Sequence, residues 1–201
     1  MKKILCLLLA VCFVMVCFSA CAKDKPDDEP VTDNVTEEAP KPVMPDIEYT
    51  DVLDLMNGDL LGKADSECGL PEESLFLTGD NVVGYDYVCI GDAIGNMTLY
   101  LTDGVVSSYV FGSAPYDNAD EFQRAFDEMN GNISDCLGTD VKGSAFHGGN
   151  SEEDAMESLF AGKGVMTAEY VTDEFTVTVT GCGVNGVATI VVECKAIGTE
   201  G

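Results

Sequence analysis

Tryptophan is missing from this sequence, and basic residues are scarce. The 201 residues include no Trp, one His, and 10 Lys and Arg against 36 Asp and Glu, for a formal net charge of −26. Such a chain is repelled by nucleic acid phosphates and by anionic lipid head groups, so we expect no nucleic acid partner. Without Trp the commonest sugar-stacking platform is missing, which leaves Tyr85, Tyr87, Tyr100 and Tyr109 for that role.

The single histidine, His147, restricts catalysis by imidazole to one place in the chain. Any Cys-His or Ser-His-Asp site would have to use it, and Cys136 is the nearest preceding thiol. The G-x-S-x-G motif of a serine hydrolase elbow does not occur. A Cys136–His147 pair and a pair of carboxylates are therefore the two catalytic arrangements left as alternatives.

Metal-binding and nucleotide-binding patterns are also lacking. The sequence has no EF-hand calcium loop, and its cysteines are not at the spacing of zinc ligands, so we predict no metal ligands. The segment Gly181-Cys182-Gly183-Val184-Asn185-Gly186 fits G-x-G-x-x-G, but β-branched residues follow it instead of a helix. We therefore predict that these glycines serve a hairpin and that no cofactor binds.

The one long apolar run, Ile4 to Phe18, has 15 residues. That is short of the roughly 20 residues that a membrane-spanning helix needs. Lys2 and Lys3 precede the run, and the small residues Ser19 and Ala20 follow it. This order is typical of an export signal, so residues 1–20 are predicted to be a signal peptide.

The residues Phe18-Ser19-Ala20-Cys21 resemble the lipobox of bacterial lipoproteins, with Phe18 where the family usually has leucine. The resemblance implies that Cys21 receives a diacylglyceryl group and becomes the mature N-terminus. It also implies a protein exported and lipid-anchored at the outer face of the cytoplasmic membrane, which is the cell surface in a single-membrane envelope. Each buried methylene contributes about 0.8 kcal/mol, so acyl chains on Cys21 would make the membrane its first partner.

Loss of the signal leaves 8 basic and 36 acidic residues, a formal net charge of −28, and reduces the nine cysteines to five beyond Cys21. These five are Cys68, Cys89, Cys136, Cys182 and Cys194. Export permits disulfides, but an odd number leaves at least one thiol free if pairing is intramolecular. Pairing among Cys68, Cys89, Cys136 and Cys182 stays open at this stage.

Residues 21–46 are predicted to be the acylated cysteine and a disordered linker. Five prolines lie there among lysines and acids, with no apolar periodicity. Such a linker spans on the order of 25–30 Å. The folded part would then begin at residue 47.

Residues 47–115 and 116–201 follow the same order of predicted elements. In the first block, Thr50 begins a helix that ends near Gly62, Pro71 begins a possible second helix, and three strands follow from Val82. In the second, Asn118 and Glu121 cap a helix ending at Gly131, a further helix ends at Gly162, and strands complete the block.

The fold class expected from this order is α+β, in two repeats of helix, possible helix and three antiparallel strands, with the helices on one face of the sheet. The order resembles that of the β-lactamase-inhibitor-protein fold and of small outer-membrane-assembly lipoproteins. The resemblance implies protein binding without catalysis. Our first hypothesis is thus a lipid-anchored binding or adaptor module with an envelope protein or glycan partner, and the alternative is an envelope or polymer hydrolase.

Turn chemistry also predicts the strand register. Asp103-Gly104 sets Thr102 opposite Val105, which places five residues on one buried face: Met97, Leu99, Leu101, Val106 and Val110. Asn185-Gly186 sets Cys182 opposite Thr189 and Cys194 opposite Val177. Cys182 and Cys194 should then lie on opposite faces of the sheet, with no disulfide between them.

Overall fold

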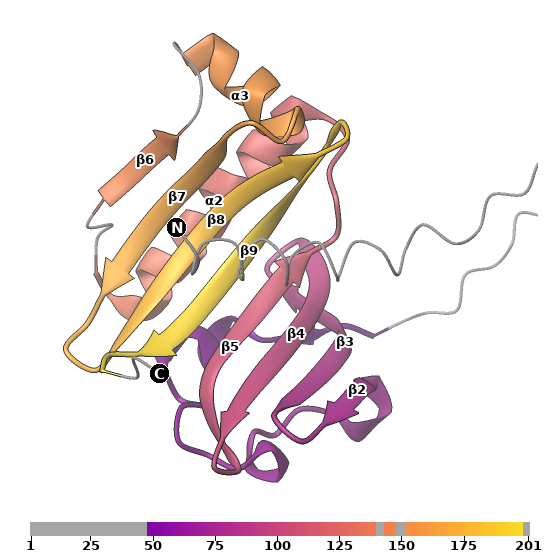
Figure 1. The fold of residues 1–201 in the computed structure, drawn as a ribbon, viewed down its shortest axis with the longest axis vertical. Coiled ribbons are helices and arrows are strands. Elements are labelled where there is room, and N and C mark those ends of the chain that lie inside the picture. Colours follow the sequence, from indigo (N-terminus) through magenta and orange to yellow (C-terminus); the bar gives the residue numbers. More distant parts are fainter. Residues whose placement is uncertain (1–47, 140–142, 148–151, 199–201) are drawn as a thin grey trace, which may run out of the picture. The chain divides into compact units, whose positions relative to one another are not determined.

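A single mixed sheet dominates the computed structural model, which describes residues 48–139, 143–147 and 152–198 (Figure 1). The strands are β1 (Thr50–Asp51), β2 (Leu75–Gly79), β3 (Val82–Ile90), β4 (Ala93–Thr102), β5 (Val105–Ser113), β6 (Gly143–His147), β7 (Val165–Val171), β8 (Phe175–Val184) and β9 (Val187–Ala196). Their order is β1-β3-β4-β5-β9-β8-β7-β6, and β2 also pairs with β3. The helices are η1 (Leu53–Asn57), η2 (Asp65–Glu67), η3 (Glu72–Ser74), α2 (Ala119–Leu137) and α3 (Glu152–Phe160).

The expected duplicated α+β fold is wrong. Within the described residues, the first half has only the 3-10 helices η1, η2 and η3 in place of α-helices, while β5 pairs directly with β9 and joins both halves into one sheet. The fold is therefore mainly β, with one long helix. The sheet, and not a repeated helix-strand unit, organises the core.

The helix predicted from Thr50 does not form, because the residues at its expected start pair with the sheet. Thr50 pairs with Val88 in β1, and the Val52 N–H donates to the Cys89 carbonyl. Gly58, in the left-handed conformation at φ 91°, then ends η1 after five residues. The segment thus has no room for the dozen or so residues that make an α-helix stable on its own.

Both predicted two-residue turns are confirmed, together with the register of β8 and β9 and the pairing of β4 with β5 next to the turn. Asp103 and Gly104 have φ of 53° and 82°, and Asn185 and Gly186 have φ of 53° and 87°. Positive φ at both central positions is the type I′ geometry that matches strand twist. Thr102 pairs with Val105, Cys182 with Thr189, and Cys194 with Val177, as expected.

One residue of the predicted buried face, Val110, is misplaced. The register shifts after Tyr100, which pairs with Ser108 while Leu101 pairs with Val106, so that Ser107 is an extra residue in β5. The Ser107 hydroxyl donates to the Tyr100 carbonyl and accepts from the Thr102 hydroxyl, which satisfies the bulge. As a result Tyr109 and Phe111 face the core, and Val110 lies on the opposite face.

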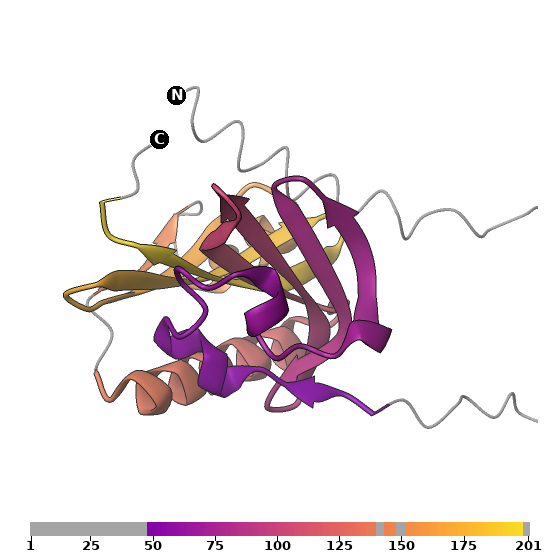
Figure 2. The ribbon, with the colours of Figure 1, turned by 90° about the horizontal axis from the view of Figure 1, so that it is seen from below.

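Helix α2 covers one face of the sheet, as both ribbon views show (Figure 2). The predicted cap is confirmed, since the Asn118 side chain accepts from the Asp120 and Glu121 amides. The predicted end at Gly131 is wrong, because the helix continues to Leu137 and stops at Gly138. Its buried stripe consists of Phe122, Phe126, Met129 and Ile133. No helix within the described residues is long and apolar enough to span a membrane.

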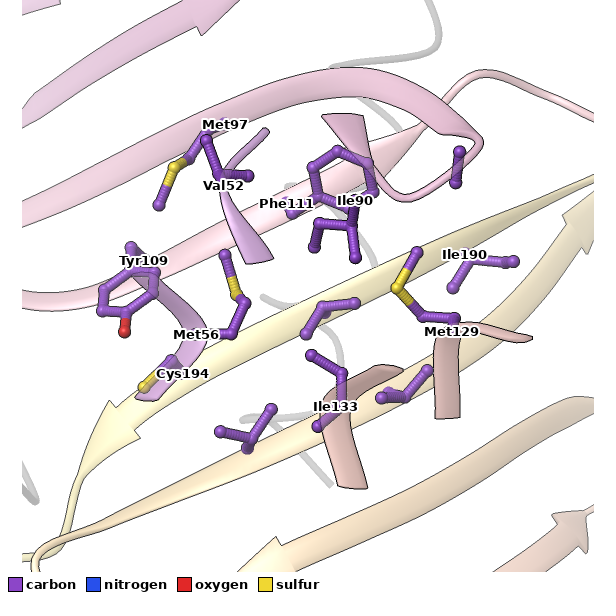
Figure 3. Close-up of a cluster of buried hydrophobic side chains, with 14 of the residues drawn as sticks. Val52, Met56, Ile90, Met97, Tyr109, Phe111, Met129, Ile133, Ile190 and Cys194 are labelled. Carbon is purple, nitrogen blue, oxygen red and sulfur yellow. The ribbon is translucent and has the colours of Figure 1, made fainter. Parts of the chain in front are cut away.

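Tyr109 links β5 to η1 inside the core. Figure 3 shows it directed toward Met56 and Cys194. Its hydroxyl accepts from the Gly58 N–H at 3.1 Å and donates to the Leu55 carbonyl. Burial raises the pKa of Tyr109 and raises that of Cys194 to about 11, so both are protonated at neutral pH. Tyr109, which the sequence offered for sugar stacking, thus joins β5 to η1 through buried hydrogen bonds.

Candidate functional site

The sheet face opposite α2 is left open by the described helices. No described helix lies over it in Figure 1. Paired residues follow one another across this face: Gly84, Thr98, Val110, Glu193, Thr178 and Glu169. We call this surface the open face; threonines and a few charges cover most of it.

Apolar side chains gather on the open face at β2, β3 and β4. Phe76, Leu77 and Tyr100 are 52%, 41% and 38% exposed, and Val82 is half-buried. Leu77 pairs with Gly84, and Val82 pairs with Tyr100, so the four lie on adjacent strands. We call Phe76, Leu77, Val82 and Tyr100 the Phe76 patch. Its exposure is typical of surfaces that receive a partner.

Gly84 makes room for the patch. A Cβ atom on Gly84 would lie 2.8 Å from the Phe76 ring and 3.1 Å from the Leu77 Cβ. The ring therefore rests directly on the backbone of β3. The ring thus packs against β3 while Phe76 stays 52% exposed.

Polar groups border the patch on the side of β5 and β9. Tyr100 pairs with Ser108, which pairs with Lys195, and Glu193 lies two residues before Lys195. Partial burial raises the pKa of Tyr100, and the charge of Glu193 raises it further. The phenol thus keeps its proton and can donate a hydrogen bond at the edge of an apolar contact. The Phe76 patch thus has apolar side chains beside hydrogen-bonding groups.

The proposed Cys136–His147 pair gains no support. The Cys136 thiol donates to the Leu53 carbonyl at 3.4 Å, and burial raises its pKa, with Asp54 and Asp59 raising it further. A nucleophilic cysteine needs the opposite shift. The backbone of His147 pairs with Val165 at the end of β6, and its side chain lies outside the described part of the chain.

The four tyrosines considered for stacking do not form a platform. Tyr85 and Tyr109 are buried in the core, whereas Tyr87 and Tyr100 are exposed. Tyr87 lies in a bulge of β3 at φ 57° and contacts Tyr49 edge to face, with ring centroids 6.3 Å apart. Tyr100 is the tyrosine of the four that the strand register places on the open face.

The glycine motif at 181–186 lies in a hairpin, as predicted, and two of its glycines also allow close packing, which was not predicted. A Cβ on Gly181 would lie 2.7 Å from the Phe122 ring, and one on Gly183 would lie 2.2 Å from the Leu159 carbonyl oxygen. Gly186 has the positive φ of the hairpin turn. Each glycine thus has a local structural reason.

A groove of about 340 Å³ lies between α2 and the β3–β4 turn. Arg124, the one arginine of the sequence, lines it together with the carboxylates of Asp92, Glu121 and Glu128. Three acids around one guanidinium do not favour an anionic ligand. Among the described residues, no group of three His, Cys, Asp or Glu side chains could hold a metal ion.

The cysteines are the remaining residues for which the sequence made predictions. Cys21, the predicted lipidation site, lies outside the described residues. Cys68, Cys89, Cys136 and Cys194 are free thiols. Cys182 lies on the open face with its sulfur 3.6 Å from the Thr189 hydroxyl, while Cys194 faces the core, so no disulfide joins these two.

Sequence reasoning missed the Phe76 patch because it assigned Leu75, Phe76 and Leu77 as apolar weight in a possible helix. The helix start at Pro71 is only the single turn η3, and β2 follows at once. The signal was present in the sequence: a turn at Asp80-Asn81 between two short apolar runs is typical of a hairpin.

Comparison with known proteins does not add to this picture. No protein-family model, no curated protein and no solved structure matches the chain.

Proposed function

We propose that the protein is a lipid-anchored, extracytoplasmic binding or adaptor module without catalytic activity. The N-terminal pattern of Lys2, Lys3, the run from Ile4 to Phe18 and Cys21 supports export and lipidation. The acid- and proline-rich residues 22–46 support a tether between membrane and folded part.

The observation that carries the binding role is the Phe76 patch on the open face. It places exposed aromatic and aliphatic side chains beside hydrogen-bonding groups, which is the composition of protein recognition surfaces. Four of the described thiols do not favour a thiol hydrolase, because burial raises the pKa of Cys68, Cys89, Cys136 and Cys194. A carboxylate hydrolase would need two acids of divergent pKa in a cleft. Burial raises the pKa of Asp86, but Asp86 does not line the groove beside α2.

Cys21 is expected to carry the lipid. Cells that express the full chain and are fed a fatty-acid analogue should incorporate the label, because acylation of the thiol precedes cleavage in the lipoprotein pathway that the sequence resembles. A Cys21→Ala variant should lose the label completely. Cys68→Ala provides the matched control, since Cys68 is buried and should leave labelling unchanged. Label that persists in Cys21→Ala would refute the anchor.

The binding role is tested by capture of the tagged full chain from cross-linked cells. Wild type and Ile94→Ser should retain the same envelope partner, and Phe76→Ser should lose most of it. Ile94 is the matched control because it is 43% exposed and lies on β4, six residues from Tyr100. Equal retention by the wild type and both variants, or a hydrolytic activity that co-purifies with the wild type, would contradict the proposal.

A further inference from the structure

Strand β2 is an unprotected edge of the sheet. It pairs with β3 on one side, and no described strand pairs with its other side. All five residues from Leu75 to Gly79 are exposed. Natural edge strands are often protected by lysine, proline, a bulge or a covering element. Strand β2 has an irregularity between Leu75 and Leu77, but it carries no lysine or proline, and no described element covers it. Its free backbone groups can therefore accept a further strand.

Acidic side chains stand at both ends of this edge. Glu72 and Glu73 lie in η3, which ends at Ser74 just before β2, and Asp80 follows β2 in the turn; all three acids are exposed. No basic residue lies between Glu72 and Asp80 in the sequence. A strand of five residues spans about 17 Å. The negative charges before and after β2 are therefore separated by the length of the strand.

We propose that β2 binds an extended segment of a partner protein, apolar in its centre and carrying lysine or arginine at both ends, by adding it to the sheet as a strand. This inference rests on the proposed binding function and names the chemistry of the partner. Backbone hydrogen bonds to β2 supply affinity without sequence preference, and alternate apolar side chains contact the Phe76 patch. The end charges pair with Glu72, Glu73 and Asp80 and set the register.

A second copy of the same chain is the less suitable occupant. Antiparallel pairing of two β2 strands would place Glu72 and Glu73 of one copy against Asp80 of the other, and like charges opposite one another destabilise a sheet. The whole chain adds a net charge of −26 to this repulsion. Charge complementarity thus selects a basic partner segment.

The probe for this interaction is a fluorescent seven-residue peptide with lysine at both ends and alternating valine and threonine between them. Anisotropy with the full chain in a non-ionic detergent should show saturable binding at low salt. Peptides with glutamate at both ends, or with an N-methylated central residue that cannot pair, should bind about tenfold more weakly or worse. Bound lysine peptide should slow hydrogen exchange of the amides in β2.

A charge-reversal variant tests the position of the site. The triple variant Glu72→Lys, Glu73→Lys and Asp80→Lys should weaken the lysine peptide about tenfold and should bind the glutamate peptide instead. The triple variant Glu157→Lys, Asp173→Lys and Glu174→Lys makes the same change in net charge at exposed positions away from β2. It should change the affinity by less than about twofold, since screening limits distant charges.

Equal weakening by both triple variants, binding that leaves the exchange of β2 unchanged, absence of peptide binding, or self-association of the wild type through β2 would each overturn strand addition. In those cases the proposed binding function would still stand if the wild type captures a cellular partner that Phe76→Ser does not capture. If the wild type captures no partner at all, the proposed function itself would fail.

Discussion

Replacement of Phe122 by alanine is expected to lower the free energy of unfolding by about 4 kcal/mol, within the 3–5 kcal/mol usual for a buried phenylalanine. The side chain is fully buried at the start of α2. Its ring contacts Tyr116 and Phe160 edge to face and Phe126 by stacking, with centroids 5.9–6.0 Å apart. Removal of the ring leaves a cavity that three other rings surround.

The backbone around this cavity cannot close it easily. The Phe122 ring fills the space above Gly181, where a Cβ would come within 2.7 Å of it, so the nearest backbone is already as close as it can be. Tyr116 is held by paired hydrogen bonds with Ala188. Rigid surroundings of this kind keep the cost of truncation near the upper part of its range, because the site does not collapse.

Urea unfolding followed by circular dichroism measures this effect. Glu128→Ala is the matched control, because Glu128 is exposed on the same helix and should change the free energy by less than about 0.5 kcal/mol. Phe122→Leu should recover more than half of the loss, since it refills much of the volume. A loss below 1 kcal/mol in Phe122→Ala would mean that α2 does not pack on the sheet through this ring.

Parts of the fold with local causes could be predicted from the sequence. Asp103-Gly104 and Asn185-Gly186 specify their turns by the positive φ that their residue types tolerate, and the register of β8 and β9 follows from the turn. Asn118 caps α2 through its own side chain. None of these features depends on distant contacts.

The wrong predictions concern segments whose structure depends on contacts with residues far away in the sequence. The helical spacing of Val52, Met56 and Leu60 is real, and all three are buried, but the pairing of Thr50 with β3 and the bonds from Tyr109 limit the segment to η1. Gly131 was expected to end α2, but it lies inside the helix at a position where an added Cβ would meet nothing within 4 Å, so glycine there is tolerated and not required. Sequence spacing alone does not distinguish these cases.

The Phe76 patch was not predicted from the sequence for the same reason. Apolar residues on one short segment predict a buried element by default, and only the pairing of β2 at the sheet edge exposes Leu75, Phe76 and Leu77. The catalytic alternative depended on a meeting of Cys136 and His147 that no spacing could establish. A function that depends on a surface formed by several strands therefore has a weak signal in any single stretch of sequence.

Replacement of Gly183 by alanine is expected to lower the free energy of unfolding by about 3 kcal/mol, the upper end for overpacking. A Cβ there would lie 2.2 Å from the Leu159 carbonyl oxygen and 3.1 Å from the Phe160 Cα, which are backbone atoms of α3. The neighbouring Gly186 N–H donates to the Phe160 carbonyl, and Leu159 is fully buried, so α3 cannot move away without losing both contacts. The strand also cannot retreat, because β8 is paired with β7 and β9 on either side.

Gly131→Ala is the matched control for this glycine, since nothing lies within 4 Å of its Cβ and alanine favours a helix; it should stabilise the protein by up to about 1 kcal/mol. Opposite signs for the two substitutions, measured by urea unfolding, would identify close packing of α3 on β8 as the cause and not the loss of glycine as such. Faster hydrogen exchange in 155–162, with β3 to β5 unchanged, should accompany Gly183→Ala, because the clash falls on α3 first. A Gly183→Ala variant as stable as the wild type would show that α3 does not rest on β8, and the packing reason for the glycine motif would then fail.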